Sequence, residues 1–146
     1  VGDFLTSGGQ HTVTYLEDDS LESGQYYLYM FDNNFGYSKT RKDYDWTVNE
    51  GIQTSITEGT TSYYYQYLVD ENEGTYTLVN SFEVPFSAYV SSAQNLGDHI
   101  VVDSGIAGLL SIYDTDGNLE QQFSIKKNDR FIYRIYFYDY KGYYFS

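Results

Sequence analysis

The feature that most constrains the fold is a repeated alternation of short, aromatic-rich segments with tight polar turns. Tyr, Phe, Val and Thr favour strands, and aromatic residues make up 20% of this chain. Gly, Asn and Asp separate the segments, and the sequence contains a single Pro. No stretch carries a long apolar stripe at helical spacing. The sequence therefore predicts an all-β protein.

The strand-like segments form a pattern that occurs twice along the chain. The first unit is predicted to contain strands over residues 11–17, 26–31, 63–69 and 75–82, and the second over 89–94, 99–103, 109–113 and 119–125. A last Tyr-rich strand pair is predicted at 131–138 and 143–145. Four short antiparallel strands are typical of one β-propeller blade. Residues 1–146, taken as a single domain, are then expected to form about three antiparallel four-stranded blades.

This blade count predicts that the propeller is partial. A closed ring needs about four or more blades. An open ring leaves sheet edges and an apolar face uncovered. We therefore expect the chain to be part of a larger propeller, to be completed by a partner piece, or to associate with further copies as a homo-oligomer.

A long polar insert, residues 36–61, interrupts the first unit and has no counterpart in the second. It is rich in Ser, Thr, Asp and Lys and contains the one tryptophan, Trp46. Loops of this length are usually functional or mobile. Two interpretations remain open, a lid over a site at the propeller mouth and a surface excursion pinned by Trp46.

Charge and composition exclude several classes of function. The formal net charge is −13, whereas nucleic-acid binding requires clustered Lys and Arg. Two small basic groups, within 39–42 and 126–130, are expected to be solvated loop charge. No apolar run is long enough to span a membrane, and without Cys the chain has no disulfides or thiolate chemistry. Because it opens on Val1 without a signal peptide, we expect a mature or trimmed product.

The candidates for chemistry are the two histidines, His11 and His99. His11 follows Gly8-Gly9, a glycine pair that suggests a close approach of the backbone to another group. A neutral imidazole is a nucleophile and, once it carries an electrophile, a good leaving group. A purely structural role for His11 also remains open. His99 opens an apolar strand and is expected to face solvent or to cap a turn.

The remaining motifs predict no metal site, no cofactor and no serine nucleophile. Residues 114–118 superficially resemble a calcium loop, but Ile125 stands at the twelfth position, where that loop needs Glu. We expect a tight hairpin turn there and also at residues 70–74. Neither Ser91-Ser92 nor Asp103-Ser104-Gly105 has the surroundings of a nucleophile elbow.

Five segments occur in an order that resembles a known enzyme family. They are Gly9-Gln10-His11-Thr12, Phe31-Asp32-Asn33, Tyr89-Val90-Ser91-Ser92, Val102-Asp103-Ser104-Gly105 and Ile112-Tyr113-Asp114. Over nearly its whole length the chain is similar to the C-terminal part of the bacterial arylsulfate sulfotransferases, which need no nucleotide sulfate donor. The resemblance implies a six-bladed propeller behind an N-terminal β-sandwich. It also implies ping-pong transfer of a sulfuryl group from an aryl sulfate donor to a phenolic acceptor through a sulfo-histidine.

By position, the resemblance implies that His11 is the nucleophile, that Ser91 supplies a hydroxyl lining the site, and that Tyr133 contacts the aromatic ring. The family's His-x-Asn pair and sulfate-binding arginine have no match here and would lie upstream. A missing N-terminal propeller portion, a fragment inactive alone, and a periplasmic, extracellular or cell-surface location follow from the same resemblance. The alternative is a non-catalytic extracellular propeller-like module that binds carbohydrate or protein through exposed tyrosines.

Overall fold

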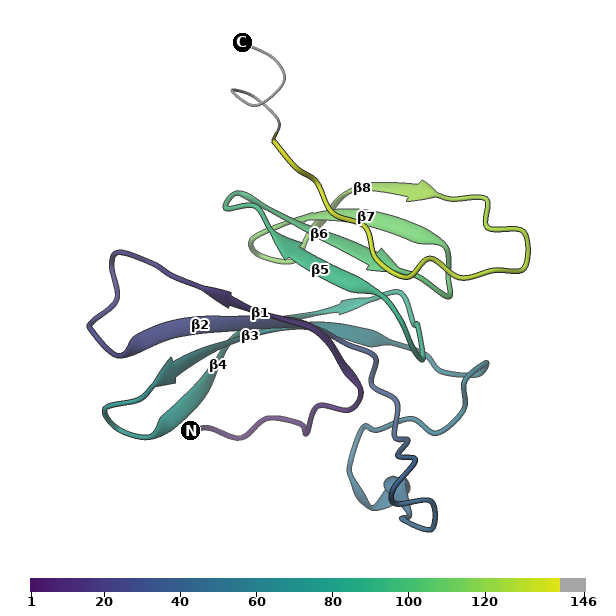
Figure 1. The fold of residues 1–146 in the computed structure, drawn as a ribbon, viewed down its shortest axis with the longest axis horizontal. Coiled ribbons are helices and arrows are strands. Elements are labelled where there is room, and N and C mark those ends of the chain that lie inside the picture. The colour runs from purple at the N-terminus through teal and green to yellow at the C-terminus, as the bar shows by residue number, and fades with distance from the viewer. Residues whose placement is uncertain (140–146) are drawn as a thin grey trace.

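The chain forms two four-stranded antiparallel sheets in a computed structural model that describes residues 1–139 (Figure 1). The first sheet contains β1 (Gln10–Leu16), β2 (Gln25–Asp32), β3 (Ser62–Asp70) and β4 (Thr75–Val84), and the second contains β5 (Ser92–Asn95), β6 (His99–Ser104), β7 (Leu109–Asp114) and β8 (Leu119–Ser124). In both sheets the strands lie side by side in chain order. The all-β prediction and the two four-stranded units are confirmed. Within residues 1–139 no helix is long and apolar enough to cross a membrane.

The main core lies between the two sheets and explains the many aromatic residues in the strands. Because side chains alternate along a strand, every second residue points toward the other sheet. The buried residues that meet there are Tyr29, Phe31, Tyr64 and Val84 from the first sheet, and Ala93, Ile100, Val102 and Tyr113 from the second. The Tyr64 ring stacks on Phe82 at 4.9 Å, and Phe82 meets Tyr113 across the interface at 4.8 Å. Large rings therefore fill the space between the sheets.

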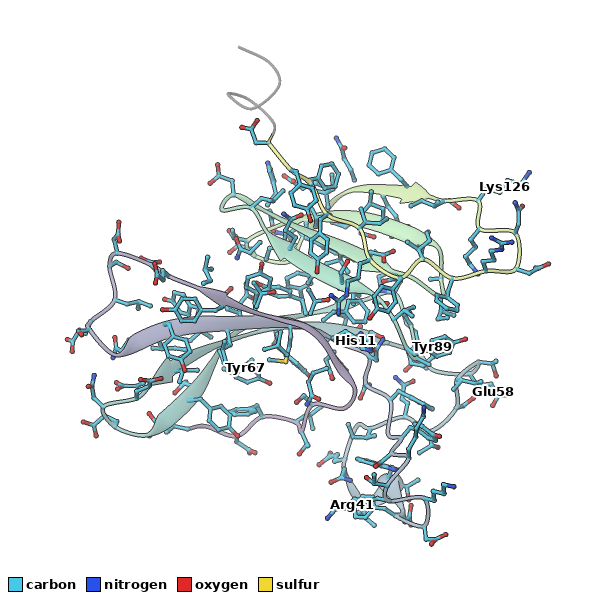
Figure 2. The ribbon with its side chains drawn as sticks, viewed as in Figure 1. His11, Arg41, Glu58, Tyr67, Tyr89 and Lys126 are labelled. Atoms are coloured by element: carbon cyan, nitrogen blue, oxygen red, sulfur yellow. The ribbon has the colours of Figure 1, made fainter. Side chains whose placement is uncertain are left out.

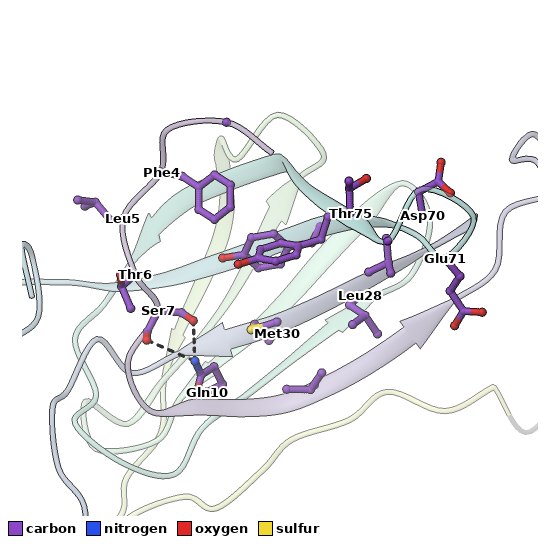
Figure 3. A pocket seen from close by; sticks show the side chains of 16 residues that line it. Phe4, Leu5, Thr6, Ser7, Gln10, Leu28, Met30, Asp70, Glu71 and Thr75 are labelled. Carbon is purple, nitrogen blue, oxygen red and sulfur yellow. Dashed lines mark hydrogen bonds between the residues drawn. The ribbon is translucent and has the colours of Figure 1, made fainter. Parts of the chain in front are cut away.

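The other face of the first sheet carries a second apolar cluster. Met30, Tyr65 and Tyr67 form it, and Phe4 packs on Tyr67 with ring centroids 5.7 Å apart. Between residues 2–7 and this face lies a hollow of about 860 Å³. Figure 3 shows Phe4 and Met30 at this hollow, and Gln10 donating to Ser7 at its edge. This face of the sheet is therefore only partly covered.

An aspartate lies buried at the same place in each sheet, near the end of the second strand. Asp32 and Asp103 are both 0% exposed. Each follows a core residue, Phe31 or Val102, so its side chain points away from the opposite sheet. Burial raises the pKa of each carboxyl to about 7. Each sheet therefore contains one buried titratable carboxyl at the equivalent position.

Two of the predicted strands differ in the structure, one in part and one entirely. The strand predicted at 89–94 begins only at Ser92, because Val90 and Ser91 have φ values of 59° and 92°. In this bent conformation the Ser91 N–H donates to the carbonyl of Tyr133 at 3.1 Å, and the Ser91 hydroxyl accepts from the Gly105 N–H at 3.0 Å. The bend therefore forms contacts that a regular strand start would not.

Residues 131–138, predicted as a strand, lie beside β5 but form no strand (Figure 1). The Ser92 hydroxyl both accepts from and donates to the backbone of Ile135, at 3.1 and 3.2 Å. The Gln94 side-chain amide does the same with Phe137, at 2.8 and 2.9 Å. Side chains thus replace the main-chain ladder of a sheet. The partner predicted at 143–145 lies outside the described residues.

The insert, residues 36–61, extends away from both sheets and is fixed at its base (Figure 1). The Gly36 N–H donates to the Gln53 carbonyl at 2.7 Å, and the Gln53 N–H donates to the Asn34 carbonyl at 3.0 Å. The insert contains a short 3-10 helix, η1 (Trp46–Val48). A Cβ atom on Gly36 would lie 2.5 Å from the Cβ of Trp46, so Trp46 packs directly on the base of the insert.

Candidate functional site

His11 lies on β1 opposite Phe31, at the end of the first sheet that meets the second. It is half-buried and borders a cavity of about 410 Å³. Figure 2 shows His11 and Tyr89 close to each other at this junction. The cavity is lined by Gly9, His11, Asn33, Phe35, Tyr37, Ile56, Ala88 and Tyr89. It therefore combines the start of β1, the chain after β2 including the insert, and the loop before β5.

The glycine pair before His11 makes the close approach that the sequence predicts. Gly9 has a φ of +77°, and a Cβ on it would lie 3.2 Å from the carbonyl oxygen of Phe35. A Cβ on Gly8 would lie 2.6 Å from Cδ1 of Ile52 in the insert. The Gly8 carbonyl accepts from the Phe35 N–H at 3.0 Å. The backbone that leads into His11 is thus held against the chain that leaves β2.

Asp32 and Asn33 hold this arrangement from the end of β2. The Asp32 carboxylate accepts from the Gly8 N–H at 2.8 Å. The Asn33 N–H donates to the Gly9 carbonyl at 3.2 Å, and its side-chain amide donates to the carbonyls of Ser87 and Val90, the latter at 3.1 Å. These two residues therefore join the start of β1 to the loop before β5.

The environment of His11 favours its neutral form. Burial lowers its pKa below 6.5, and the positive charge of Arg134 lowers it further. The imidazole is consequently unprotonated at pH 7, with a nitrogen lone pair able to act as a nucleophile.

Aromatic rings form two walls of the His11 cavity. Phe35 and Tyr37 stack with their centroids 6.4 Å apart and their planes 16° apart. Tyr89 meets Phe131 edge-on at 5.9 Å. Tyr37 is 62% exposed, so this wall opens to solvent. Such walls suit a flat aromatic ligand that enters from solution.

Ser91 is fully buried and does not line this cavity. Its hydroxyl donates to the hydroxyl of Ser87 at 2.8 Å, and its carbonyl accepts from the hydroxyl of Thr12 at 3.3 Å. These bonds join the loop before β5 to β1. The role of Ser91 as a hydroxyl facing the substrate stays a prediction.

Tyr133 lies outside the cavity lining and is 56% exposed. Its ring lies beneath the Arg134 guanidinium, at 5.0 Å from the ring centroid. Its contact with a substrate ring stays a prediction.

His99 lies on the surface, as the sequence predicts. It is exposed, and its Nδ1 lies 2.8 Å from a carboxylate oxygen of Glu120.

The sequence analysis missed several residues around His11. Phe35 and Tyr37 follow directly after Asp32-Asn33-Asn34, so an aromatic pair behind that motif was a usable signal. Ile56 carries no local signal, because only the folding of the insert brings it to the cavity. The insert contributes Tyr37 and Ile56 to the lining of the His11 cavity.

Comparison with known proteins identifies the family of this chain. The family model described as arylsulfotransferase (ASST) matches residues 1–139. No curated protein and no solved structure matches the chain significantly. The family match covers nearly all of the 146 residues. The chain therefore belongs to the arylsulfotransferase (ASST) family.

Proposed function

We propose that this chain carries the nucleophile of an arylsulfate sulfotransferase and that His11 is that nucleophile. The family supports aryl sulfotransferase activity, with an aryl sulfate donor and a phenolic acceptor. The observation that carries the residue assignment is a half-buried imidazole, held neutral, at an aromatic cavity.

The proposed reaction proceeds in two balanced steps. In the first, an imidazole nitrogen of His11 attacks the sulfur of the aryl sulfate. The N–S bond forms, the S–O bond to the ring breaks, and the donor oxygen leaves with the electron pair as a phenolate. In the second, the oxygen of an acceptor phenol attacks the same sulfur. The N–S electrons return to the imidazole, and the acceptor proton passes to solvent.

We further propose that the two sheets are adjacent blades of a propeller completed by an N-terminal portion or by further copies. Two meander sheets packed face to face support this arrangement. Every residue of β8 is exposed, and the outer face of the first sheet is only partly covered, so both are free to pack against further sheets. On this proposal the chain is inactive alone. The periplasmic or extracellular location rests on the family resemblance.

Exchange kinetics test the function in the complete protein that contains this chain. His11→Asn keeps a polar side chain but removes the nucleophile, so exchange between a chromogenic aryl sulfate and phenol should fall by several orders of magnitude. His99→Asn is the matched control and should keep the wild-type rate. Retention of the rate by His11→Asn would exclude the proposal and favour a binding module.

A further inference from the structure

A buried oxygen without a hydrogen-bond partner lies at the His11 cavity, on the side chain of Asn33. Asn33 is fully buried and is one of the residues that line the cavity. Its Oδ1 atom accepts no hydrogen bond from any of residues 1–139. Burying an amide oxygen without a donor costs free energy, so native proteins retain few such atoms. The position of this atom beside the proposed nucleophile indicates a role there.

The orientation of the Asn33 amide is fixed by the loop before β5. Its Nδ2 donates to the Val90 carbonyl at 3.1 Å and to the Ser87 carbonyl. A half-turn of the amide would place Oδ1 against these two carbonyl oxygens and would break both bonds. Ser62 fixes the same corner, because its hydroxyl donates to the Asn33 carbonyl at 3.1 Å and accepts from the Ser87 N–H at 3.0 Å. Oδ1 is therefore held facing away from this loop.

On the side away from the loop, Oδ1 lies against β1. A Cβ atom on Gly9 would lie 3.3 Å from the Cβ of Asn33 and 3.8 Å from its Oδ1. The Asn33 N–H donates to the Gly9 carbonyl, and His11 pairs with Phe31, so His11 and Asn33 are diagonal neighbours across β1 and β2. Diagonal neighbours on one face lie about 7–8 Å apart, with their Cβ atoms somewhat closer, which is within reach of aromatic side chains. The His11 ring can therefore reach Oδ1.

The His11 ring is also the donor that best fits this oxygen. Because Oδ1 is not accessible to solvent, neither water nor a substrate phenol contacts it. The other side chains of the cavity that carry a donor are Tyr37 and Tyr89, and both are exposed, so water can bind their hydroxyls. The His11 ring is half-buried and forms no hydrogen bond with another of residues 1–139. A donor and an acceptor thus lie in one cavity, both without a partner in the described part of the chain.

We propose that Asn33 is a positioning residue, whose Oδ1 accepts a hydrogen bond from one ring N–H of His11 and leaves the other ring nitrogen free to attack the substrate sulfur. This inference rests on the proposed function of His11. A neutral imidazole has one N–H and one lone-pair nitrogen, and the bond made by the N–H determines which nitrogen is the nucleophile. The bond forms when the ring turns toward Oδ1, since catalytic hydrogen bonds tighten as a site is completed.

The same bond serves the sulfo-histidine. Attack by the free nitrogen forms the N–S bond and leaves the N–H in place, so the modified ring carries a positive charge. A hydrogen bond from this charged N–H to Oδ1 is stronger than one from a neutral ring. When the acceptor phenol takes the sulfuryl group, the N–S electrons return to the ring, and the N–H is still bound to Asn33.

Nitrogen-15 NMR of the imidazole tests the inference independently of activity. The complete protein is labelled with nitrogen-15 histidine, and the His11 signals are assigned by their absence from His11→Asn. At pH 8 the His11 ring should populate a single tautomer in the wild type. Asn33→Leu keeps the size of the side chain but removes the acceptor, so it should give a mixture of both tautomers. Asn33→Asp keeps an oxygen acceptor in either protonation state and should retain the single tautomer.

Kinetics measure the consequence for transfer. Asn33→Leu should lower kcat about 10- to 100-fold with little change in KM, because a misplaced nucleophile costs most in the transition state. Ser62→Ala is the matched control. It removes two bonds at the same corner but leaves Oδ1 in place, so it should lower stability while the tautomer and kcat stay as in the wild type.

The outcomes separate this inference from the proposed function. Two tautomers in the wild type, or an unchanged single tautomer in Asn33→Leu, would overturn the inference while the function stands. The wild-type measurement decides even if Asn33→Leu does not fold. An equal loss of kcat in Ser62→Ala would mean that Asn33 acts only by holding the loop before β5, which also overturns the inference. If His11→Asn keeps its activity, the proposed function is wrong whatever the tautomer.

Discussion

The first and second sheets share a plan but differ in what precedes their first strand. Gln10 pairs with Asp32 in one sheet, as Ser92 pairs with Asp103 in the other, so the two buried aspartates occupy equivalent positions. In the first sheet the Gly8 N–H donates to Asp32, and the glycine pair leads on to His11. In the second sheet both carboxylate oxygens of Asp103 lack a partner among the described residues. The candidate site thus lies in the sheet where the loop that enters the first strand folds against the buried aspartate.

The connections between the second and third strands differ as well. In the first sheet this connection runs over residues 33–61 and supplies Phe35, Tyr37 and Ile56 to the cavity. In the second it covers only residues 105–108. A Cβ on Gly105 would lie 2.0 Å from the carbonyl oxygen of Ile132, so that turn is closed by the segment beside β5. This long connection therefore supplies one of the two aromatic walls of the candidate site, Phe35 and Tyr37.

The buried aspartates should show the largest effect on stability. An Asp carboxyl has a pKa near 3.9 when unfolded, whereas Asp103 has a pKa of about 7 in the folded chain. The free energy of unfolding should therefore fall as pH rises from about 4 to 7, because over this range the carboxyl ionises in the unfolded chain but stays protonated in the folded one. Asp103→Asn removes this dependence and should stabilise the protein by about 2–4 kcal/mol at pH 8. Urea unfolding of the wild type and of Asp103→Asn at pH 4 and pH 8 measures this difference in the free energy of unfolding.

Asp32→Asn is the matched variant in the first sheet. Its carboxyl also has a pKa of about 7, and the asparagine oxygen can still accept from Gly8. The increase in unfolding free energy of Asp32→Asn at pH 8 should be similar in size to that of Asp103→Asn. If neither variant changes the pH dependence of unfolding, the two carboxyls are not buried as described.

The glycine before His11 should show the next largest effect. Gly9→Ala places a side chain at a φ of +77° and 3.2 Å from the Phe35 oxygen. Gly97→Ala, in the turn between β5 and β6, has a φ of +88° but meets no atom within 4 Å. Backbone strain should lower stability by about 1–2 kcal/mol in both. Only Gly9→Ala should also lower the transfer rate, because it alone displaces the backbone at His11. Equal rates in the two variants would contradict a site built by this close approach.

The smallest effect is expected from Tyr37, the ring that the insert adds to one wall of the His11 cavity. Tyr37→Ala removes one ring of the stacked pair and should raise KM for the aryl sulfate several-fold with little change in kcat. Tyr76→Ala is a suitable control, because Tyr76 is 55% exposed and lies on β4, at the hollow on the other face of the first sheet. A large loss of kcat in Tyr37→Ala would mean that the ring does more than bind the donor.

Local signals predicted most of the strands, whereas long-range contacts produced the differences. The hairpin of β3 and β4 was predictable because a polar turn over residues 70–74 separates two aromatic runs. The start of β5 was not, because the positive φ of Ser91 depends on its bonds to Tyr133 and Gly105. The glycine pair identified the close approach at His11.

The most direct test of the account is to locate the transferred group itself. The complete protein is treated with an aryl sulfate without acceptor, and the added sulfuryl group is mapped by mass spectrometry under conditions that preserve N–S bonds. The account predicts the group on the peptide that contains His11, its loss on addition of phenol, and its absence from His11→Asn. A sulfuryl group on any other residue, or an unchanged adduct in His11→Asn, would contradict it.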